Sequence, residues 1–213
     1  MKRIVIFFSS IILLLGLFGA ANATTVNYLY AVNGNEFTSP YSGAIVEDFE
    51  GATEIWNWTG DGAIVKGSTG INAAPFGVSS EDATWYVTVP FDLYDNEPNF
   101  ATAELGGYYN YFGIWWGSVD TYNTLSFYND SALVASFTGS QIVSNANGNQ
   151  TSPLTNLYVN FLYLPTFNKF EMASTNYAFE ADNIAVGVVP EPATMLLLGL
   201  GLIGLAGARR FKN

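Results

Sequence analysis

The chain has 213 residues, 49% of them hydrophobic, a formal net charge of −11, and neither histidine nor cysteine. Without histidine, Ser-His-Asp and Cys-His catalysis and every histidine-ligated zinc or copper site are excluded. Without cysteine there are no disulfides, so the fold must depend on its apolar core.

The chain begins with the pattern of a secretory signal. Lys2 and Arg3 precede an almost wholly apolar run over residues 4–18, and Ala-Asn-Ala follows at residues 21–23. A basic start, an apolar centre and an A-x-A site predict a signal peptide over residues 1–23, cut by signal peptidase after Ala23. The alternative is an uncleaved membrane anchor.

The middle of the chain, residues 24–189, is typical of an all-β domain. Short runs rich in aromatic and β-branched residues alternate with turn residues, and no sustained helical periodicity interrupts them. We expect a β-sandwich of the jelly-roll type, flanked by an N-terminal signal helix and a C-terminal transmembrane helix. The predicted strands cover residues 26–32, 44–49, 55–59, 63–66, 84–89, 102–105, 109–116, 124–128, 133–137, 158–164, 170–173 and 178–186.

This middle domain is strongly acidic. It holds 17 acidic residues against Lys66 and Lys169, a net charge near −15. Such a surface repels phosphates, so nucleic acid is not expected as a partner. It would attract divalent cations or tolerate neutral glycans, or it serves solubility alone.

Two pairs of acidic residues suggest calcium. Asp48 and Glu50 lie near an early strand, and Glu180 and Asp182 open the last one. Each pair shares one face of its strand, and the first and last strands of a sandwich are often neighbours. Carboxylate oxygens are the ligands that calcium prefers, so we expect a calcium site here, with solvated edge charges as the alternative.

The densest aromatic segment offers a second candidate site. Trp115 and Trp116 are adjacent in a predicted strand and must therefore face opposite sides. An exposed tryptophan beside Asp120, Tyr122 and Asn123 would give a sugar a flat apolar face with hydrogen-bonding groups at its rim. The alternative is that both rings are core residues and that Asp120 and Asn123 bond their own turn.

The C-terminal segment combines a proline motif, an apolar run and a basic end. Pro190, Glu191 and Pro192 precede an uninterrupted apolar stretch over residues 193–208, and Arg209, Arg210 and Lys212 follow. An apolar stretch of this kind, helped by snorkelling arginines, is sufficient for a membrane-spanning helix. The basic end is expected to stay cytoplasmic.

Residues 190–213 resemble the PEP-CTERM sorting signal. The resemblance implies recognition by an exosortase, a membrane-embedded cysteine transpeptidase that cuts near the proline motif. It also implies a bacterium that makes an exopolysaccharide or biofilm matrix. We therefore expect a protein of a Gram-negative-type bacterium, anchored transiently in the inner membrane by its C-terminal helix and then held at the cell surface or secreted.

A second stretch resembles a subgroup of PEP-CTERM proteins with a W-G-S-[IV]-D-x-Y-N-[ST] core. Residues 116–124, Trp-Gly-Ser-Val-Asp-Thr-Tyr-Asn-Thr, match this core at every position. Residues 70–85 and 179–186 are similar to its flanking blocks. The resemblance implies location and fold and adds no biochemical activity.

The expected function is a structural or interaction module associated with exopolysaccharide or biofilm. The alternative is a lectin-like glycan-binding module. Hydrolysis of a glycan by paired carboxylates is the catalytic route that the composition leaves open, but we expect no enzyme. No cofactor other than calcium is expected.

Overall fold

The computed structural model describes residues 25–30, 38–51, 54–77, 80–81, 83–93, 99–190 and 200–201. The predicted signal peptide with its cleavage site at Ala23 lies outside the described residues. So do Glu191, Pro192 and most of the predicted C-terminal helix.

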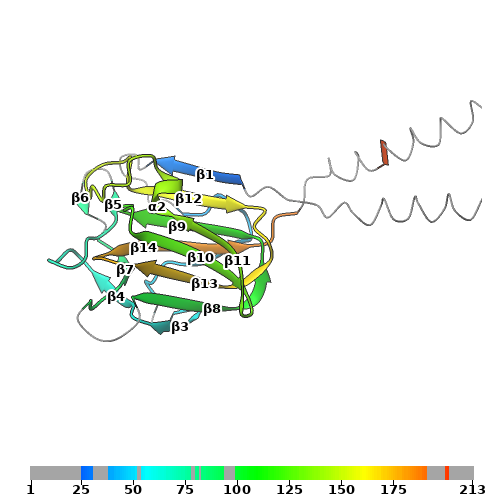
Figure 1. The fold of residues 1–213 in the computed structure, drawn as a ribbon, viewed down its shortest axis with the longest axis horizontal. Helices are drawn as coiled ribbons and strands as arrows, with labels where there is room; N and C mark the ends of the chain where they lie inside the picture. The colour runs from blue at the N-terminus through cyan, green and yellow to red at the C-terminus, as the bar shows by residue number, and fades with distance from the viewer. Residues whose placement is uncertain are drawn as a thin grey trace, which may run out of the picture.

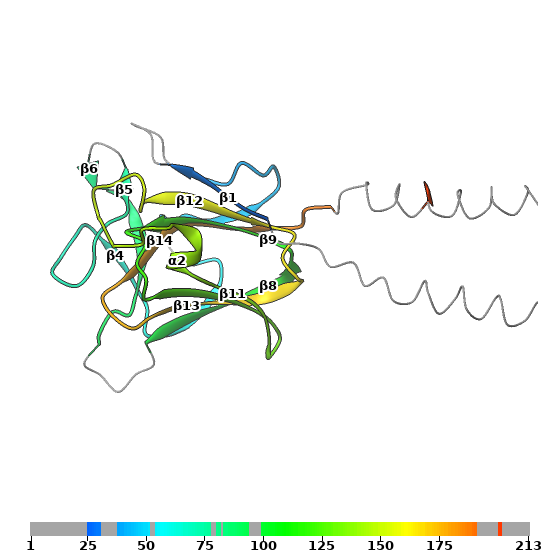
Figure 2. The ribbon, with the colours of Figure 1, turned by 45° about the horizontal axis from the view of Figure 1, so that its top comes forward.

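Two antiparallel sheets pack face to face as a sandwich, and the two layers separate clearly in Figure 2. The larger sheet has the order β1-β12-β9-β14-β7-β4, with β2 beside β14. Its strands are β1 (Thr25–Tyr30), β2 (Ile45–Glu47), β4 (Ala63–Lys66), β7 (Trp85–Val89), β9 (Tyr111–Gly117), β12 (Leu157–Leu162) and β14 (Phe179–Gly187).

The smaller sheet has the order β11-β10-β13-β8-β3. Its strands are β3 (Asn57–Gly60), β8 (Phe100–Tyr109), β10 (Asn123–Asn129), β11 (Ala132–Thr138) and β13 (Phe167–Ser174). A small hairpin of β5 (Phe76–Gly77) and β6 (Ser80–Glu81) and one short helix, α2 (Gly139–Ile142), complete the described elements. The predicted sandwich is confirmed, and strands β7 to β10 alternate between the two sheets as in a jelly roll.

The last strand, β14, holds the larger sheet together. Its first half pairs with β7 and its second half with β2, while β9 accompanies both halves on the other side. The register with β9 shifts between Asp182 and Ala185, and Asn183 there has a φ of 46°. A bulge of this kind bends the strand, so two different partners can follow one another along the same edge.

Aromatic rings from both sheets fill the space between the layers. Phe112 of β9 lies 4.9 Å from Phe127 of β10 and 4.8 Å from Phe170 of β13, measured between ring centroids. Near the end of β9, the Trp116 ring stacks on that of Phe179, the first residue of β14, at 4.3 Å. These contacts join β9 to two strands of the opposite sheet and to β14 beside it, and burial of such large rings stabilises the fold.

The larger sheet is buried on both faces. Every residue of β9 and of β12 is buried. The outer face is covered by the segment Asn72–Pro75, which is itself buried, and by Tyr41, whose ring lies 4.4 Å from that of Tyr111. A strand that is covered on both faces has a nearly continuous apolar sequence, which explains why β9 consists almost entirely of apolar and aromatic residues.

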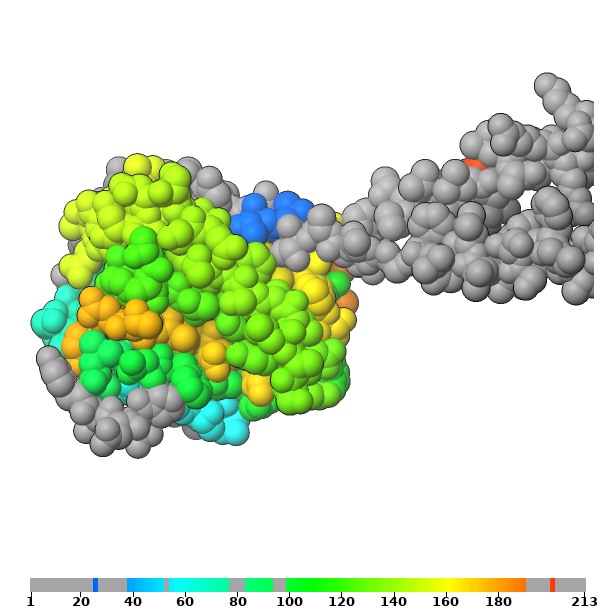
Figure 3. Space-filling view, viewed as in Figure 1, coloured from blue at the N-terminus to red at the C-terminus, as the bar shows by residue number. Residues whose placement is uncertain are grey.

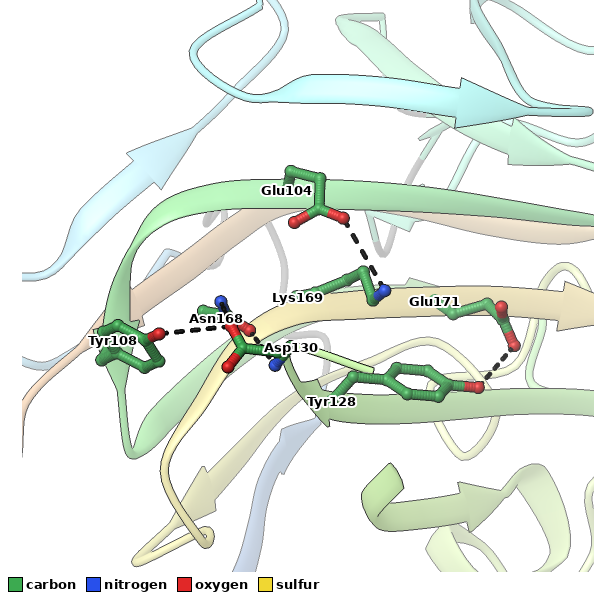
Figure 4. A network of polar contacts seen from close by, with 7 residues as sticks. All are labelled: Glu104, Tyr108, Tyr128, Asp130, Asn168, Lys169 and Glu171. Atoms are coloured by element: carbon green, nitrogen blue, oxygen red, sulfur yellow. Dashed lines mark hydrogen bonds and ion pairs between the residues drawn. The ribbon is translucent and has the colours of Figure 1, made fainter. Parts of the chain in front are cut away.

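The smaller sheet turns one face to solvent, and in Figure 3 its edge strand β11 and the loop after it lie along one side of that face. Polar side chains line it (Figure 4): Lys169 lies 3.7 Å from Glu104, and the Tyr128 hydroxyl donates to Glu171 at 3.2 Å. The Lys169 ammonium also lies 5.2 Å from the centre of the Tyr128 ring. Buried residues alternate with partly exposed ones along most of β13, as in a strand with one face toward solvent.

The sandwich has two distinct ends. β1 begins and β14 finishes at the same end, on the right in Figure 1, and we call it the terminal end. The opposite end carries the turn between β9 and β10, the start of β14 and the β5–β6 hairpin, and we call it the distal end. The sorting motif therefore follows one end of the domain, and the segment resembling the PEP-CTERM subgroup lies at the other.

Candidate functional site

The turn over residues 118–122 connects β9 of the larger sheet to β10 of the smaller one. Ser118 has a φ of 39°, and its backbone N–H donates to the Asn156 side chain at 2.8 Å. The next N–H, that of Val119, donates to the Thr155 carbonyl at 2.7 Å. The turn is therefore fastened to the loop before β12 by its own backbone.

Asn123 is the centre of a hydrogen-bonded group that joins three segments. Its side-chain oxygen accepts the Asp120 N–H at 2.9 Å, and its side-chain nitrogen lies 3.2 Å from the Ser174 hydroxyl and 3.3 Å from the Ala178 carbonyl. The residue is fully buried. The predicted alternative, in which Asp120 and Asn123 bond their own turn, describes this geometry.

Glu180 is a buried carboxylate at the same end. One of its oxygens accepts the Ala73 N–H at 2.9 Å, and the other accepts the Ser118 hydroxyl at 2.8 Å. Burial, with a smaller contribution from the nearby Asp120, raises the pKa of Glu180 to about 7 despite the lowering effect of these hydrogen bonds. The group ties the covering segment Asn72–Pro75 to the turn between the sheets.

Asp120 and Tyr122 adjoin Glu180. Burial raises the pKa of Asp120, opposed by a hydrogen bond from Tyr122. Gly148 packs directly against the Asp120 carboxylate, and a Cβ at that position would overlap it. Gly148 also has a φ of 62°, which favours glycine. Asp120 is therefore enclosed by the loop before β12 and does not present its carboxylate to an open surface.

The two tryptophans face opposite sides, as predicted, but neither is exposed. Trp116 belongs to the core between the sheets with an exposed fraction of 0%, and Trp115 on the other face has 3%. The expectation that one ring is exposed as a platform is wrong, because the larger sheet is covered on its outer face as well. Trp115 and Trp116 offer a sugar no flat surface in this fold.

The four residues expected to bind calcium lie in two neighbouring strand regions, since β2 pairs with β14. Asp48 and Glu50 are exposed, and their carboxylates accept backbone N–H groups, Asp48 from Glu50 at 3.2 Å and Glu50 from Trp85 at 2.6 Å. Asp182 is buried and accepts the Thr84 hydroxyl at 3.1 Å.

Among the residues that the structure describes, no group of three or more acidic side chains could hold a metal ion. The buried acid near β2 is Glu47, whose two oxygens accept the N–H groups of Phe49 at 3.0 Å and Ile55 at 2.6 Å. Calcium binding by Asp48, Glu50, Glu180 and Asp182 stays a prediction.

An exposed aromatic surface lies elsewhere, beside the edge strand β4. Trp85 and Phe91 are 41% and 44% exposed, and they border a shallow depression of about 410 Å³. Lys66, Thr69 and the buried Asn72 also line it, with the Lys66 ammonium 6.0 Å from the centre of the Trp85 ring. We call this surface the Trp85 depression. Trp85 ends the 70–85 block noted in the sequence, but its exposure depends on its place at the start of β7, beside the edge strand β4.

A larger cleft of about 510 Å³ opens between the edge strands β3 and β4. Trp56 and Trp58 line it, but Trp56 is buried and both rings pack edge-on against Phe170 at 5.8 and 5.4 Å. The cleft therefore offers mainly strand edges and small polar groups, and the Trp85 depression is the better aromatic surface.

Comparison with protein families finds the PEP-CTERM protein-sorting motif over residues 188–210. Comparisons with curated proteins and with solved structures gave no match. The chain thus carries a PEP-CTERM sorting motif, and the similarity that was found is confined to the residues of that motif. The motif directs it through an exosortase to the cell surface or the exterior.

Of the motif, the structure describes Val188, Val189, Pro190 and residues 200–201. Within the described ranges, the structure contains no helix with the length and apolar character needed to cross a membrane. The predicted span over residues 193–208 falls almost entirely outside those ranges.

Proposed function

We propose that the exported domain is a non-enzymatic structural or interaction module of the extracellular matrix of a Gram-negative-type bacterium. The observation that carries this proposal is the placement of the sorting motif directly after β14, at the terminal end of a closed sandwich. An enzyme that joins this end to an envelope component leaves the rest of the domain facing outward. We propose exopolysaccharide as the partner that the outward-facing domain contacts.

Buried carboxylates support a non-enzymatic role. Glu47 and Glu180 each have both oxygens occupied by protein N–H or O–H donors. A carboxylate-pair glycosidase needs two acids that face a bound sugar about 5–10 Å apart. Glu47 and Glu180 instead bond neighbouring segments of the protein to one another, and both are buried.

Fractionation of producing cells tests the proposed display. With the exosortase present, the domain is expected in the surface and matrix fractions, and after deletion of the exosortase it is expected in the inner-membrane fraction. The same distribution in both strains would refute exosortase-dependent display. Release of reducing sugars from the producer's polysaccharide by the recovered protein would refute the non-enzymatic role.

The Trp85 depression favours a second function, binding of a neutral saccharide. An exposed tryptophan supplies an apolar face for sugar C–H groups, and the exposed side chains of Lys66 and Thr69 supply hydrogen-bonding partners beside it. The net charge near −15 disfavours strongly anionic glycans. This moves the predicted aromatic platform from β9 to the start of β7.

Retention on the producer's own polysaccharide tests this second function. Trp85→Ala is expected to lower retention at least tenfold. Tyr108→Ala is the matched control, because Tyr108 is 55% exposed but lies near the end of β8, in the other sheet, and is not among the residues that line the Trp85 depression. Equal retention of both variants and the parent would exclude a saccharide site at Trp85.

A further inference from the structure

The last described residues before the proline motif are part of the folded sandwich. Asn110 lies in the turn between β8 and β9, and its backbone N–H donates to the Gly187 carbonyl at 3.1 Å. Its side-chain nitrogen donates to the Val189 carbonyl at 2.8 Å, and its side-chain oxygen accepts the Val189 N–H at 2.7 Å. We call these three hydrogen bonds the Asn110 clamp.

The Val189 side chain adds an apolar contact. It packs against the buried cluster of Tyr111, Leu162 and Ala185 at the terminal end. Val188, between the two clamped residues, is 71% exposed. The chain therefore leaves the sandwich after Val189, and no spacer separates the domain from Pro190.

The clamp and the sorting motif overlap in sequence. The matched motif starts at residue 188, so Val188 and Val189 belong both to the motif and to the fold. Enzymes that cut or transfer a peptide bind it as an extended segment through its backbone N–H and C=O groups. Both of these groups of Val189 are already engaged by Asn110. The Val189 N–H and C=O therefore cannot bond Asn110 and a bound enzyme at the same time.

We propose that Asn110 restrains the start of the sorting motif and thereby slows exosortase processing. The closed clamp keeps the start of the motif on the sandwich, and the enzyme engages the motif when residues 187–189 detach. The proposal rests on exosortase processing of this chain. It makes the rate of tail removal depend on the opening of a few hydrogen bonds at the terminal end and leaves the core unchanged.

The expected size of the effect follows from the bonds involved. Chain ends open locally at a small fraction of the global free energy of unfolding. Loss of the two side-chain bonds of Asn110 shifts such an opening equilibrium by about tenfold. Asn110→Ala is therefore expected to remove the tail about tenfold faster than the parent.

Asn168→Ala is a closely matched control. The Asn168 carboxamide also makes two hydrogen bonds to a turn, accepting the Asp130 N–H at 2.8 Å and donating to its carboxylate at 2.9 Å (Figure 4). These bonds fasten the β10–β11 turn and do not involve the C-terminal segment. The control therefore measures a general loosening of the sandwich without release of Val189.

Asn110→Asp gives a graded variant. An aspartate keeps the acceptor for the Val189 N–H and loses the donor to the Val189 carbonyl. We expect a rate between those of the parent and Asn110→Ala. The graded variant also preserves the test if the alanine variant does not accumulate.

The experiment follows full-length chains in producing cells by pulse-chase, separating tail-bearing from tail-less forms. Amide exchange of Val189 in the purified full-length protein, measured by NMR, reports the clamp independently. The proposal predicts faster processing and faster Val189 exchange in Asn110→Ala, with Asn168→Ala equal to the parent in both. Equal or slower processing of both Asn110 variants, in a strain that processes the parent, overturns the role of the clamp. Failure to process the parent overturns exosortase processing itself.

Discussion

The two ends of the sandwich are held together in different ways. At the distal end, Glu180, Asp120 and Asn123 are buried, and their polar atoms join segments from both sheets. At the terminal end, the half-buried Asn110 bonds the backbone of Val189, and the Val189 side chain packs on a small apolar cluster where the chain leaves the fold. The distal end depends on a buried polar network, and the last residues at the terminal end are held by a few hydrogen bonds and one apolar contact.

The comparison separates stability from processing. A buried polar group that loses its partner costs the full desolvation penalty, so changes at the distal end should destabilise the whole domain. A bond at an exposed chain end can break without unfolding the rest. The distal end, which resembles a PEP-CTERM subgroup, thus determines the stability of the domain. The terminal end, beside the sorting motif, can open locally while the domain stays folded.

The largest effect is expected at Asn123. Asn123→Ala removes one acceptor and two donor contacts from a fully buried position, so the Asp120 N–H loses its partner. The free energy of unfolding should fall by about 3–4 kcal/mol, measured by urea denaturation. Thr121→Ala in the same turn is exposed and should change it by less than about 0.5 kcal/mol. Equal effects of the two variants would show that the buried hydrogen bonds of Asn123 do not stabilise the distal end.

The next effect concerns Glu180 and pH. Because its folded-state pKa of about 7 lies above the ordinary value of 4.5, the folded state keeps a proton that the unfolded state releases between these pH values. The contribution of this group to stability is present below about pH 4.5 and is lost as pH rises through about 7. Near pH 8 the buried charge costs roughly 3 kcal/mol.

Glu180→Gln tests this assignment, because the amide can keep a bond to Ala73 and never ionises. The variant should gain roughly 2–3 kcal/mol over the parent at pH 8 and little at pH 4.5, measured by thermal unfolding across this range. Glu104→Gln, at a surface position, should leave the pH dependence unchanged. A parallel pH profile for parent and Glu180→Gln would contradict burial of an ionisable group at the distal end.

A smaller effect is expected for global stability at Asn110. Asn110→Ala should lower the free energy of unfolding by about 1 kcal/mol, because the clamp lies at the edge of the fold. Asn110→Ala should nevertheless change the rate of processing more than Asn123→Ala does. The two variants therefore separate the roles of the two ends. A loss as large as that of Asn123→Ala in urea denaturation would show that the terminal end supports the core.

The smallest effect is expected on the open face of the smaller sheet. Glu104→Gln removes the partner of Lys169 at an exposed position, and the free energy of unfolding should change by less than about 0.5 kcal/mol. A double-mutant cycle with Lys169→Met measures the coupling. A coupling above about 1 kcal/mol would mean that surface charges contribute as much as the clamp.

The sheet architecture could be predicted because it depends on local patterns. Each predicted strand has a counterpart in the structure wherever alternation or an apolar run extends over four or more residues. The β5–β6 hairpin, with two residues in each strand, is too short to leave such a pattern. The pairing of β14 with both β2 and β7 depends on a bulge at Asp182 and Asn183 that no periodicity announces.

The candidate sites could not be placed by the same means, because exposure depends on distant segments. Trp115 and Trp85 look alike in sequence, but Trp115 lies in the centre of a sheet that Asn72–Pro75 covers, and Trp85 begins a strand near the edge. Asn110 is recognisable as a turn residue, yet its partner Val189 lies 79 positions away. Glu47, not Asp48, faces inward because β2 pairs with β14 in one register.

Mass spectrometry of the mature protein from producing cells tests the central claim most directly. The account predicts a chain that begins at Thr24 and ends near the proline motif, without the apolar run and the basic residues that follow it. Recovery of a chain that still carries Arg209, Arg210 and Lys212, from cells with an active exosortase, would contradict it.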